Sequence, residues 1–428
     1  MANPTAFQRT MITTAPRFAL AGVKILDFSR VLAAPTASMI LGDLGGEVWK
    51  IEKPGAGDDT RIWTPPEVNG QSCYFLCVNR NKKSLALDLG KPEGQALAKQ
   101  LAIKADVVVE NFKTGNMAKF GLDYESLRKI NKGIIYCSVT GYGSHGPYAG
   151  DPGYDVIASA LGGMLNATGP PDGAPCRTAT AVTDIMTGLY AHGAILAALY
   201  NRKETGLGQL INCNLLSTQL AAMINLASNY LNTGKEAKRL GTQHESIVPY
   251  QAFETSDNRW FVVGAANNKS FNKLCNLMEL PELLTDPRFT TNPLRVQNRK
   301  ALLDIIGERF KQKSLAHWTK ALRVPELPSG PVNTFEEAFS HPQVKHLGLI
   351  KDVTHPTYGT VKIVGPPVEY SDIQNNIRYA PPTLGEHTIE ILRDNLDLSL
   401  DDIRALKDRK IVDFPEYQAE AAAKKKAV

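Results

Sequence analysis

The sequence from Val23 to Glu52 reads VKILD–FSRVLAAPTASMILGD–LGGEVWKIE, and this stretch decides the class of fold. An apolar run of strand length comes first, then apolar residues at helical spacing, then a second strand-like run. Further strand-like runs at 84–87, 106–109 and 134–138 alternate with helical stretches at 93–104 and 124–130. Parallel strands need such helical crossovers. The pattern therefore predicts an α/β fold with a parallel sheet and ligand-binding loops at the carboxyl ends of its strands.

The regular alternation of short strands and helices ends after this region. A long helix is expected at 185–202, a strand at 210–214 and another helix at 217–231. From about 241 to 327 the pattern predicts a short strand at 260–263 and helices at 269–278 and 299–312. PELPSGP at 325–331 is rich enough in Pro and Gly to mark a domain boundary. We therefore expect a second, smaller domain in this part of the chain.

Composition excludes several classes of protein. The chain has 428 residues, 43% hydrophobic and 21% charged, which is an ordinary globular balance. Its net charge of +5 is too small and too scattered to suggest a nucleic-acid partner. The most apolar stretch, 186–200, is shorter than the roughly 18 residues of a membrane span. Six scattered cysteines fit reduced thiols in a reducing compartment.

The first 26 residues contain no acidic residue but include Arg9, Arg17 and Lys24. A basic, hydroxylated, acid-poor segment is typical of a mitochondrial transit peptide. The same composition also fits a disordered arm of a cytosolic protein. We expect a mitochondrial matrix protein, with the second possibility open.

GYGSHG at 141–146 matches the letters of a dinucleotide-binding loop and follows a strand. That fingerprint should open a helix, but Pro147, Gly150 and Pro152 follow immediately. The segment is therefore expected to be a loop whose backbone a phosphate-bearing ligand can approach. The chain contains no GxxxxGK[ST], GxSxG or HExxH motif, so nucleotide hydrolysis, an elbow serine and a zinc protease lack support.

Asp184 stands at the head of the long apolar helix. An aspartate there is most often an N-cap that accepts hydrogen bonds from free backbone N–H groups. The alternative is a nucleophilic carboxylate, kept ionised by the helix N-terminus and used in covalent catalysis. Local sequence leaves both roles open.

Ordered sequence blocks from about residue 20 to 390 resemble the family III CoA-transferases, of the CaiB/BaiF type. The blocks are RVLAAPT (30–36), LGDLGGEVWKIEKP (41–54), GDDTR (57–61), NRNKKSLALDL (79–89), DVVVENF (106–112), GYGSHGP (141–147), TGLYAHGAILAAL (187–199), VPYQAF (248–253), DPRF (286–289), GPVN (330–333) and LGEHT (384–388).

The resemblance implies a large Rossmann-like domain built from both chain ends, with a smaller α+β domain inserted, and an interlocked homodimer. The large CoA-binding domain would cover 20–215, a linker helix and the small domain 216–330, and the return to the large domain with the tail 331–428. We expect no nucleic-acid or membrane partner.

The resemblance also implies the site. Asp184 matches the family's nucleophile, and Tyr142 matches a residue near the thioester end. Either lysine of the CoA set could instead be a solvated surface charge. For a second substrate carboxylate we expect His244, with Arg177 as runner-up, although a loop-stabilising hydrogen bond is an equal alternative for His244. The residues that match CoA contacts are Arg30, Val31, Ala33, Lys53, Asn111, Phe112 and Lys119.

The implied reaction moves CoA from succinyl-CoA to glutarate or a related dicarboxylate (3-hydroxy-3-methylglutarate, adipate) through aspartyl anhydride and aspartyl-CoA thioester intermediates. CoA is the co-substrate, and no metal or other cofactor is implied. Leu32, Thr140 and the segment 241–246 depart from the oxalate-acting members and argue against formyl or oxalyl transfer.

Two alternatives remain. The same fold carries α-methylacyl-CoA racemases, but Tyr154 stands where those enzymes have a catalytic His, and a phenol of pKa about 10 is a poor base. A catalytically silent CoA-binding scaffold would have no use for an ionised Asp184.

Overall fold

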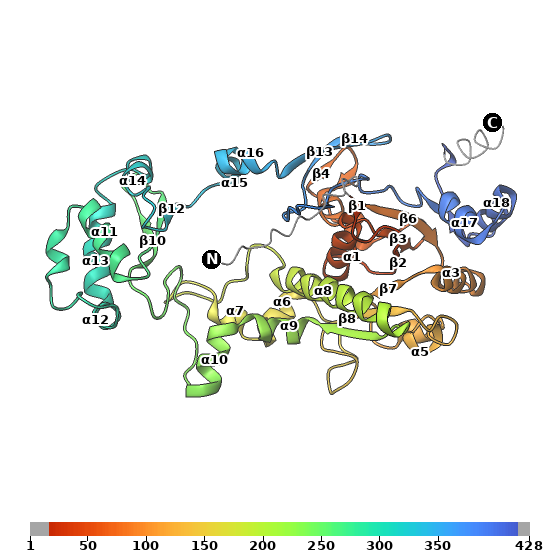
Figure 1. Cartoon of the computed structure of the whole chain (residues 1–428), viewed down its shortest axis with the longest axis horizontal. Helices are drawn as coiled ribbons and strands as arrows, with labels where there is room; N and C mark the ends of the chain where they lie inside the picture. Colours follow the sequence, from red (N-terminus) through yellow and green to blue (C-terminus); the bar gives the residue numbers. More distant parts are fainter. Residues whose placement is uncertain (1–16, 418–428) are drawn as a thin grey trace, which may run out of the picture. The chain divides into compact units, whose positions relative to one another are not determined.

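The computed structural model describes residues 17–417, which divide into two compact units (Figure 1). The first unit takes in the chain up to Gly162, then Ala179–Ile224, and the chain from Gly348 onward. The second unit consists of Gly163–Thr178 and Asn225–Leu347. The sequence placed the borders at 215 and 330 and did not assign residues 163–178 to the insertion. The first unit is therefore built from segments that lie before and after the second unit in the sequence.

A seven-stranded sheet forms the centre of the first unit, in the order β16-β6-β3-β2-β7-β8-β9. All its strands run parallel except β16, which pairs antiparallel with β6 at one edge. Chain order reverses between β2 and β7, which is the switch point of a doubly wound sheet, where ligands bind. The strands are β2 (Lys24–Asp27), β3 (Glu47–Glu52), β6 (Lys82–Leu87), β7 (Val107–Glu110), β8 (Ile135–Thr140), β9 (Leu210–Asn214) and β16 (Val412–Asp413).

Helices cover both faces of the sheet, because successive strand residues point to opposite sides and both sides are apolar. In β2, Ile25 packs with α1 (Ala33–Asp43) and α8 (Val182–Thr205), while Leu26 packs on the other face. That other face carries α3 (Pro92–Lys104), α5 (Tyr124–Leu127), α17 (Thr388–Leu396) and α18 (Leu400–Asp408). The predicted α/β architecture is confirmed.

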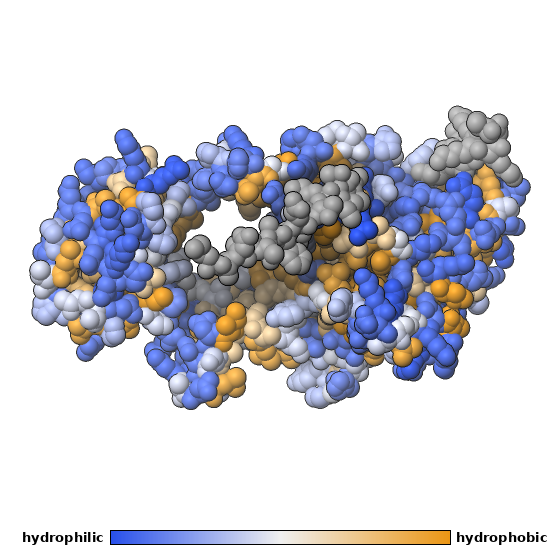
Figure 2. Space-filling model, in the orientation of Figure 1, coloured by the Kyte–Doolittle hydropathy of each residue, from blue (hydrophilic) through white to orange (hydrophobic). Residues whose placement is uncertain are grey.

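Helix α8 begins three residues before the expected Ile185 and ends at Gly206, whose φ of 70° only glycine adopts freely. Gly188 brings α8 close to α1, because a Cβ there would lie 2.6 Å from the Ala33 carbonyl oxygen. By length and composition alone α8 would also pass as a membrane span, although 44% of that stretch is buried. Leu189 and Tyr190 on α8 remain exposed, and apolar patches interrupt the hydrophilic surface in Figure 2.

Two sequence-based predictions of helices were wrong in extent. The helix expected at 217–231 is two helices, α9 (Leu215–Ala222) and α10 (Ile224–Thr233), and the chain turns at Ile224 with a φ of 37°. The helix expected at 124–130 is the single turn α5. Smaller elements of the first unit are β1 (Arg17–Phe18), β4 (Glu67–Val68), β5 (Gln71–Ser72), α2 (Cys73–Cys77), α4 (Asn116–Lys119), α6 (Asp155–Leu161), β13 (Ile350–His355), β14 (Gly359–Val364) and β15 (Ile373–Gln374).

The second unit contains its own apolar core. An antiparallel sheet of β10 (Tyr250–Glu254), β11 (Trp260–Gly264) and β12 (Ser329–Pro331) packs on helices around Phe253 and Phe310, whose rings stack 4.9 Å apart. Its helices are α7 (Met164–Ala167), α11 (Asn268–Leu277), α12 (Asn292–Gln297), α13 (Arg299–Phe310), α14 (Leu315–Ala321), α15 (Phe335–Ser340) and α16 (Pro342–Leu347).

Candidate active site

The loops that follow β2 and β7 meet at the switch point of the sheet. The Arg30 backbone N–H donates to Asn111 Oδ1 at 2.9 Å, and Asn111 Nδ2 donates back to the Arg30 carbonyl at 2.7 Å. The Arg30 guanidinium lies 5.3 Å from the centre of the Phe112 ring and 3.1 Å from an Asp59 carboxylate oxygen. Three residues that the sequence placed in one site are therefore in contact.

A cavity of about 210 Å³ opens beside these loops. It is bounded by the loops after β2, β7 and β8 and by the first turn of α8. Leu32 and Gly141 also face it, so its wall is partly apolar. The sequence-predicted residues that line it are Arg30, Val31, Ala33, Asn111, Phe112 and Asp184.

Asp184 is buried in the first turn of α8, with 8% of its surface exposed. It is not the N-cap, because the helix begins at Val182 and Ala181 occupies the cap position without a side-chain bond. Its own backbone N–H donates to Asp155 Oδ1, on the first turn of α6, at 3.1 Å. Of the two roles that the sequence left open, capping is excluded by this geometry.

Burial and, after it, the negative charge of Asp155 together raise the pKa of Asp184 to about 7. The other charged side chains that line the cavity are Arg30, Asp59, Lys113 and Asp151. A carboxylate with a pKa near neutrality is a stronger base than an ordinary one and is still largely ionised at pH 8. Asp184 therefore has the properties of an activated nucleophile.

Hydroxyl groups fix the turn that carries Asp184 from two sides. The Thr183 hydroxyl donates to Gln219 Oε1 on α9 at 2.6 Å, and it lies 2.9 Å from the Ser159 hydroxyl on α6. All three side chains are buried. Asp184 therefore stands on a backbone that has little freedom to move.

A second cavity of about 430 Å³ lies on the other side of Arg30. Arg30, Asp59 and Phe112 line both cavities, so the two are neighbours. Its wall also contains Lys53, the aromatic side chains of Phe28 and Phe120, and the acidic residues Glu52, Asp58 and Asp88. The aromatic rings suit an adenine, and Arg30 and Lys53 are the cations on this wall that could meet phosphate groups.

Four of the predicted residues line neither cavity, and two of these, Lys119 and Tyr142, belong to the first unit. Lys119 is exposed on α4 and donates to Asn116 Oδ1 at 3.0 Å. The Tyr142 ring packs 5.7 Å from that of Tyr148. The backbone N–H of Gly143, in the loop at 141–146, donates to the Thr140 hydroxyl at 2.9 Å. Roles for Lys119 and Tyr142 stay predictions.

His244 and Arg177 belong to the second unit. His244 Nδ1 accepts from the Ser246 backbone N–H at 3.1 Å, and its ring lies 5.4 Å from that of Tyr250. This is the kind of loop-stabilising bond that we gave as the alternative role. Arg177 is exposed. Recognition of a substrate carboxylate by either residue stays a prediction.

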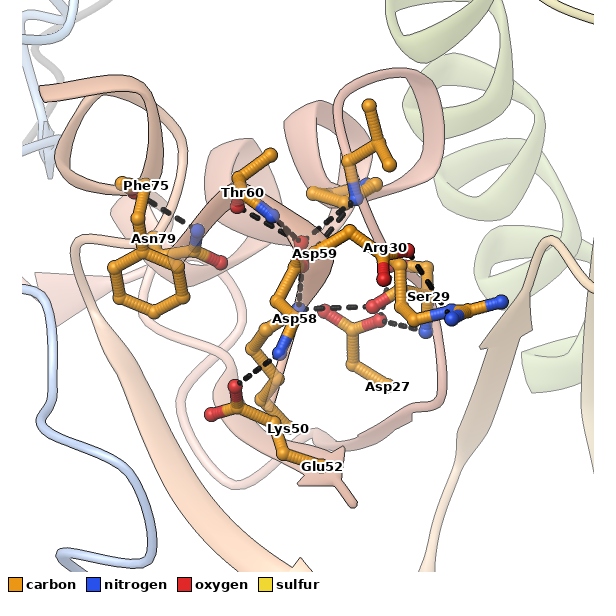
Figure 3. Close-up of polar contacts among 12 residues, drawn as sticks. Asp27, Ser29, Arg30, Lys50, Glu52, Asp58, Asp59, Thr60, Phe75 and Asn79 are labelled. Carbon is orange, nitrogen blue, oxygen red and sulfur yellow. Dashed lines mark hydrogen bonds and ion pairs between the residues drawn. The ribbon is translucent and has the colours of Figure 1, made fainter. Parts of the chain in front are cut away.

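Sequence reasoning missed a buried ionic cluster beneath the Arg30 loop and the contact of Asp155 with Asp184 (Figure 3 draws the cluster). Lys50 and Asp58 form a fully buried pair with Nζ and Oδ2 2.8 Å apart. Lys50 stands among the apolar residues of β3, and an ionisable residue in an otherwise apolar strand was a signal that could have been used. The Asp155 contact joins residues 29 positions apart and left no local signal.

Comparison with known proteins decides the family. The model of CoA-transferase family III matches residues 20–388. The chain belongs to this family. This family III CoA-transferase is 51% identical to the succinyl-CoA:glutarate CoA-transferase of Mus musculus and 50% identical to that of Homo sapiens, in each case over 88% of this chain and 86% of the relative. A CAIB/BAIF family protein from Brucella suis has a similar structure, with a TM-score of 0.80 and 40% identity over 89% of this chain and 100% of that one.

A family III CoA-transferase exchanges CoA between carboxylic acids, with acyl-CoA and free acids as its substrates. Coenzyme A is thus a co-substrate. Among residues 17–417 there is no group of three or more His, Cys, Asp or Glu side chains arranged to hold a metal ion.

Proposed function

We propose that this enzyme transfers CoA from succinyl-CoA to glutarate or a related dicarboxylate such as 3-hydroxy-3-methylglutarate or adipate. The observation that carries the proposal is Asp184, buried and with a raised pKa, on the wall of the cavity that the Arg30 and Asn111 loops border. The names of the mammalian relatives, which are about half identical to this chain, support the pair of acids.

The chemistry needs one carboxylate. Asp184 attacks the succinyl-CoA thioester carbonyl, the C–S bond breaks, and an aspartyl-succinyl anhydride and CoA thiolate result. The thiolate then attacks the aspartyl carbonyl, which releases succinate and leaves an aspartyl-CoA thioester. Glutarate attacks that thioester carbonyl, expels the thiolate and forms an aspartyl-glutaryl anhydride. The thiolate finally attacks the glutaryl carbonyl of this anhydride, which gives glutaryl-CoA and frees Asp184. Each step exchanges one activated acyl bond for another, so no ATP is consumed.

The burial of Asp184 serves this sequence of steps. Anhydrides and thioesters hydrolyse, so a reaction that passes through them must exclude water. The apolar wall at Leu32 contributes to that exclusion. Burial also strengthens the carboxylate as a nucleophile, because the charged form loses hydration that the neutral acyl forms do not need.

The neighbouring cavity suits the nucleotide end of CoA. Arg30 and Phe112 present a guanidinium and an aromatic ring to it, and Lys53 stands at its edge. We propose that adenine packs against this pair and that Lys53, together with Lys119, meets the phosphates. The remaining predicted contacts, Val31, Ala33, Asn111 and Tyr142, would follow the pantetheine arm toward Asp184.

A dicarboxylate brings a second charge, which needs a donor because an unpaired buried charge is costly. We propose His244, and after it Arg177, for that role. The exposed apolar side chains on α8 support a homodimer, since such patches mark interaction surfaces. For location we propose the mitochondrial matrix, on the basic N-terminal composition; the first 16 residues lie outside the described part of the chain.

The test is direct mass measurement of the enzyme after brief incubation with succinyl-CoA. A CoA adduct on the peptide that contains Asp184, discharged by added glutarate with formation of glutaryl-CoA, is the expected result. A protein that binds CoA without forming an adduct would be a scaffold. Solvent-deuterium exchange at the α-carbon of a 2-methylacyl-CoA, without acyl exchange, would indicate a racemase.

A further inference from the structure

Val31 has a backbone conformation that its side chain disfavours. Its φ is 70°, in the left-handed region, where β-branched residues are rare because the side chain crowds the backbone. Val31 lies between Arg30 and the start of α1 at Ala33, and all three line the cavity that holds Asp184. Something in the fold must hold the chain in this turn.

Asp58 supplies that restraint. The Val31 backbone N–H donates to Asp58 Oδ1 at 3.1 Å, and its distance to Oδ2 is 3.3 Å. The backbone N–H and hydroxyl of Thr60 also donate to Oδ1, at 3.0 and 2.8 Å. The Asp58 side chain has no exposed surface, so no water competes for these bonds. Figure 3 draws the bonds between Asp58 and Thr60 as dashed lines.

Lys50 orients the Asp58 carboxylate. Its ammonium group is fully buried, 2.8 Å from Asp58 Oδ2, and it also donates to the Ser29 carbonyl at 2.8 Å. Burial alone would raise the pKa of Asp58, but the Lys50 charge and hydrogen bonds outweigh it and bring that pKa to about 2. The acceptor is therefore ionised at every working pH.

A second buried pair holds the other end of the turn. The Ser29 backbone N–H donates to Asp27 Oδ1 at 2.8 Å, and the Ser29 hydroxyl bonds to the same oxygen. Asp27 in turn pairs with buried Lys82 at 3.2 Å. The turn is thus fixed at Ser29 and at Val31, and Arg30 between them is the residue whose side chain points away from the cluster to contact Phe112 and Asp59.

We propose that Asp58, oriented by Lys50, is a positioning residue for CoA. Asp58 imposes the left-handed conformation of Val31, and this conformation presents Arg30 and the start of α1 to the ligand. The inference rests on the proposed function, since it takes this cavity to be the CoA site. A pair that served stability alone would be indifferent to which residue occupies position 31.

That difference gives the experiment. Glycine adopts a φ of 70° without strain, whereas alanine does not. Asp58→Asn removes the negative charge that pairs with Lys50 and weakens the hydrogen bond that the Val31 backbone N–H donates to this side chain. We compare Asp58→Asn with Asp58→Asn/Val31→Gly and Asp58→Asn/Val31→Ala. The alanine variant is the matched control, because both substitutions remove the Val31 side-chain contacts and only glycine relieves the backbone strain.

The readouts are KM and kcat for succinyl-CoA and the Kd of free CoA by calorimetry. Asp58→Asn should raise KM and Kd by about tenfold with kcat changed by less than about threefold. Val31→Gly should restore most of that loss, and Val31→Ala should not. Equal effects of glycine and alanine, or an unchanged KM in Asp58→Asn, would overturn the proposal.

Two further measurements cover a variant that does not fold. Asp58→Glu keeps the charge for Lys50 but displaces the acceptor from Val31, and the same glycine rescue should apply. In the wild type without CoA, the Val31 amide should be protected from hydrogen exchange, and rapid exchange would contradict the restraint. The wild type separates the two proposals. If the wild type neither exchanges CoA between acids nor forms the adduct, the proposed function is rejected. If the wild type is active but Val31→Gly does not restore KM and Kd in Asp58→Asn, only the role of Asp58 is rejected.

Discussion

Two buried carboxylates at the same edge of the sheet have opposite acidities. Asp58 and Asp184 are both withdrawn from water, yet the pKa of Asp58 falls to about 2 and that of Asp184 rises to about 7. Asp58 has Lys50 and several hydrogen-bond donors within reach, whereas Asp184 has another carboxylate, Asp155, as its charged neighbour. Burial amplifies whatever charge lies nearby. The first arrangement yields a fixed anion that holds the backbone, and the second yields a reactive one.

The strongest test of the comparison removes the reactive carboxylate. Asp184→Ala should lower the rate of CoA exchange by on the order of a thousandfold or more, because the carboxylate that forms the proposed covalent intermediate is lost. CoA affinity, measured by calorimetry, should stay within several-fold of the wild type. Exchange at a tenth of the wild-type rate would contradict a covalent role for Asp184.

Removing the Lys50 ammonium group, which pairs with the Asp58 carboxylate, should lower the stability of the fold. Lys50→Met leaves Asp58 buried with less charge compensation, and the free energy of unfolding should fall by about 3 kcal/mol. Chemical denaturation at pH 8 measures this. Lys50→Met/Asp58→Leu, which makes both positions apolar, is the control and should recover part of the loss. If the double variant is no more stable than the single one, the unpaired charge is not the cause.

Asp184 should itself be a source of instability at neutral and higher pH. Its folded-state pKa is raised from 3.8 to about 7, so the folded protein binds this proton more tightly than the unfolded chain does. Stability from this group is full below pH 4 and is lost as the pH rises toward 7. Asp184→Asn should therefore be more stable than the wild type at pH 8, by on the order of 2 kcal/mol.

The gain of Asp184→Asn should be mostly lost at pH 4, because the folded carboxyl is protonated there and the pH is close to the unfolded-state pKa of 3.8. Melting temperatures of the two proteins at pH 4, 6 and 8 test this dependence. A constant difference across the range would show that packing, and not charge, separates them.

The smallest expected effect is a shift in the pH dependence of the rate. With ionised Asp184 as the proposed nucleophile, kcat/KM should fall as the pH drops below about 7. Asp155→Asn keeps an oxygen to accept from the Asp184 N–H but removes the negative charge, so the acid limb should move to lower pH by about half a unit. Asp151→Asn, another carboxylate on the same cavity, is the control and should leave the limb in place.

The sequence predicted the sheet well, because the core strands between 24 and 140 are mostly apolar and alternate with helical spacing, although β6 begins at Lys82, two residues before the apolar run at 84–87. It did not predict the break between α9 and α10, since Met223 and Ile224 continue the apolar pattern and only the backbone shows the turn. At the site, the resemblance to the family was needed to predict a catalytic role for Asp184, because the local sequence fits an N-cap equally well. The residues that set its pKa and hold the turn at Val31 come from distant parts of the chain, so no spacing rule predicts them.

Gly188 has a practical consequence for redesign of the enzyme. It lies one helical turn beyond Asp184 on α8, at the point where an added methyl group would meet the Ala33 carbonyl and the Thr36 side chain of α1. Any larger residue there must push α8 away from α1, and the reacting carboxylate would move with its helix. Attempts to broaden the range of acceptor acids should therefore vary the cavity wall, for example at Leu32, and leave position 188 untouched, because the close spacing of α1 and α8 fixes where Asp184 stands.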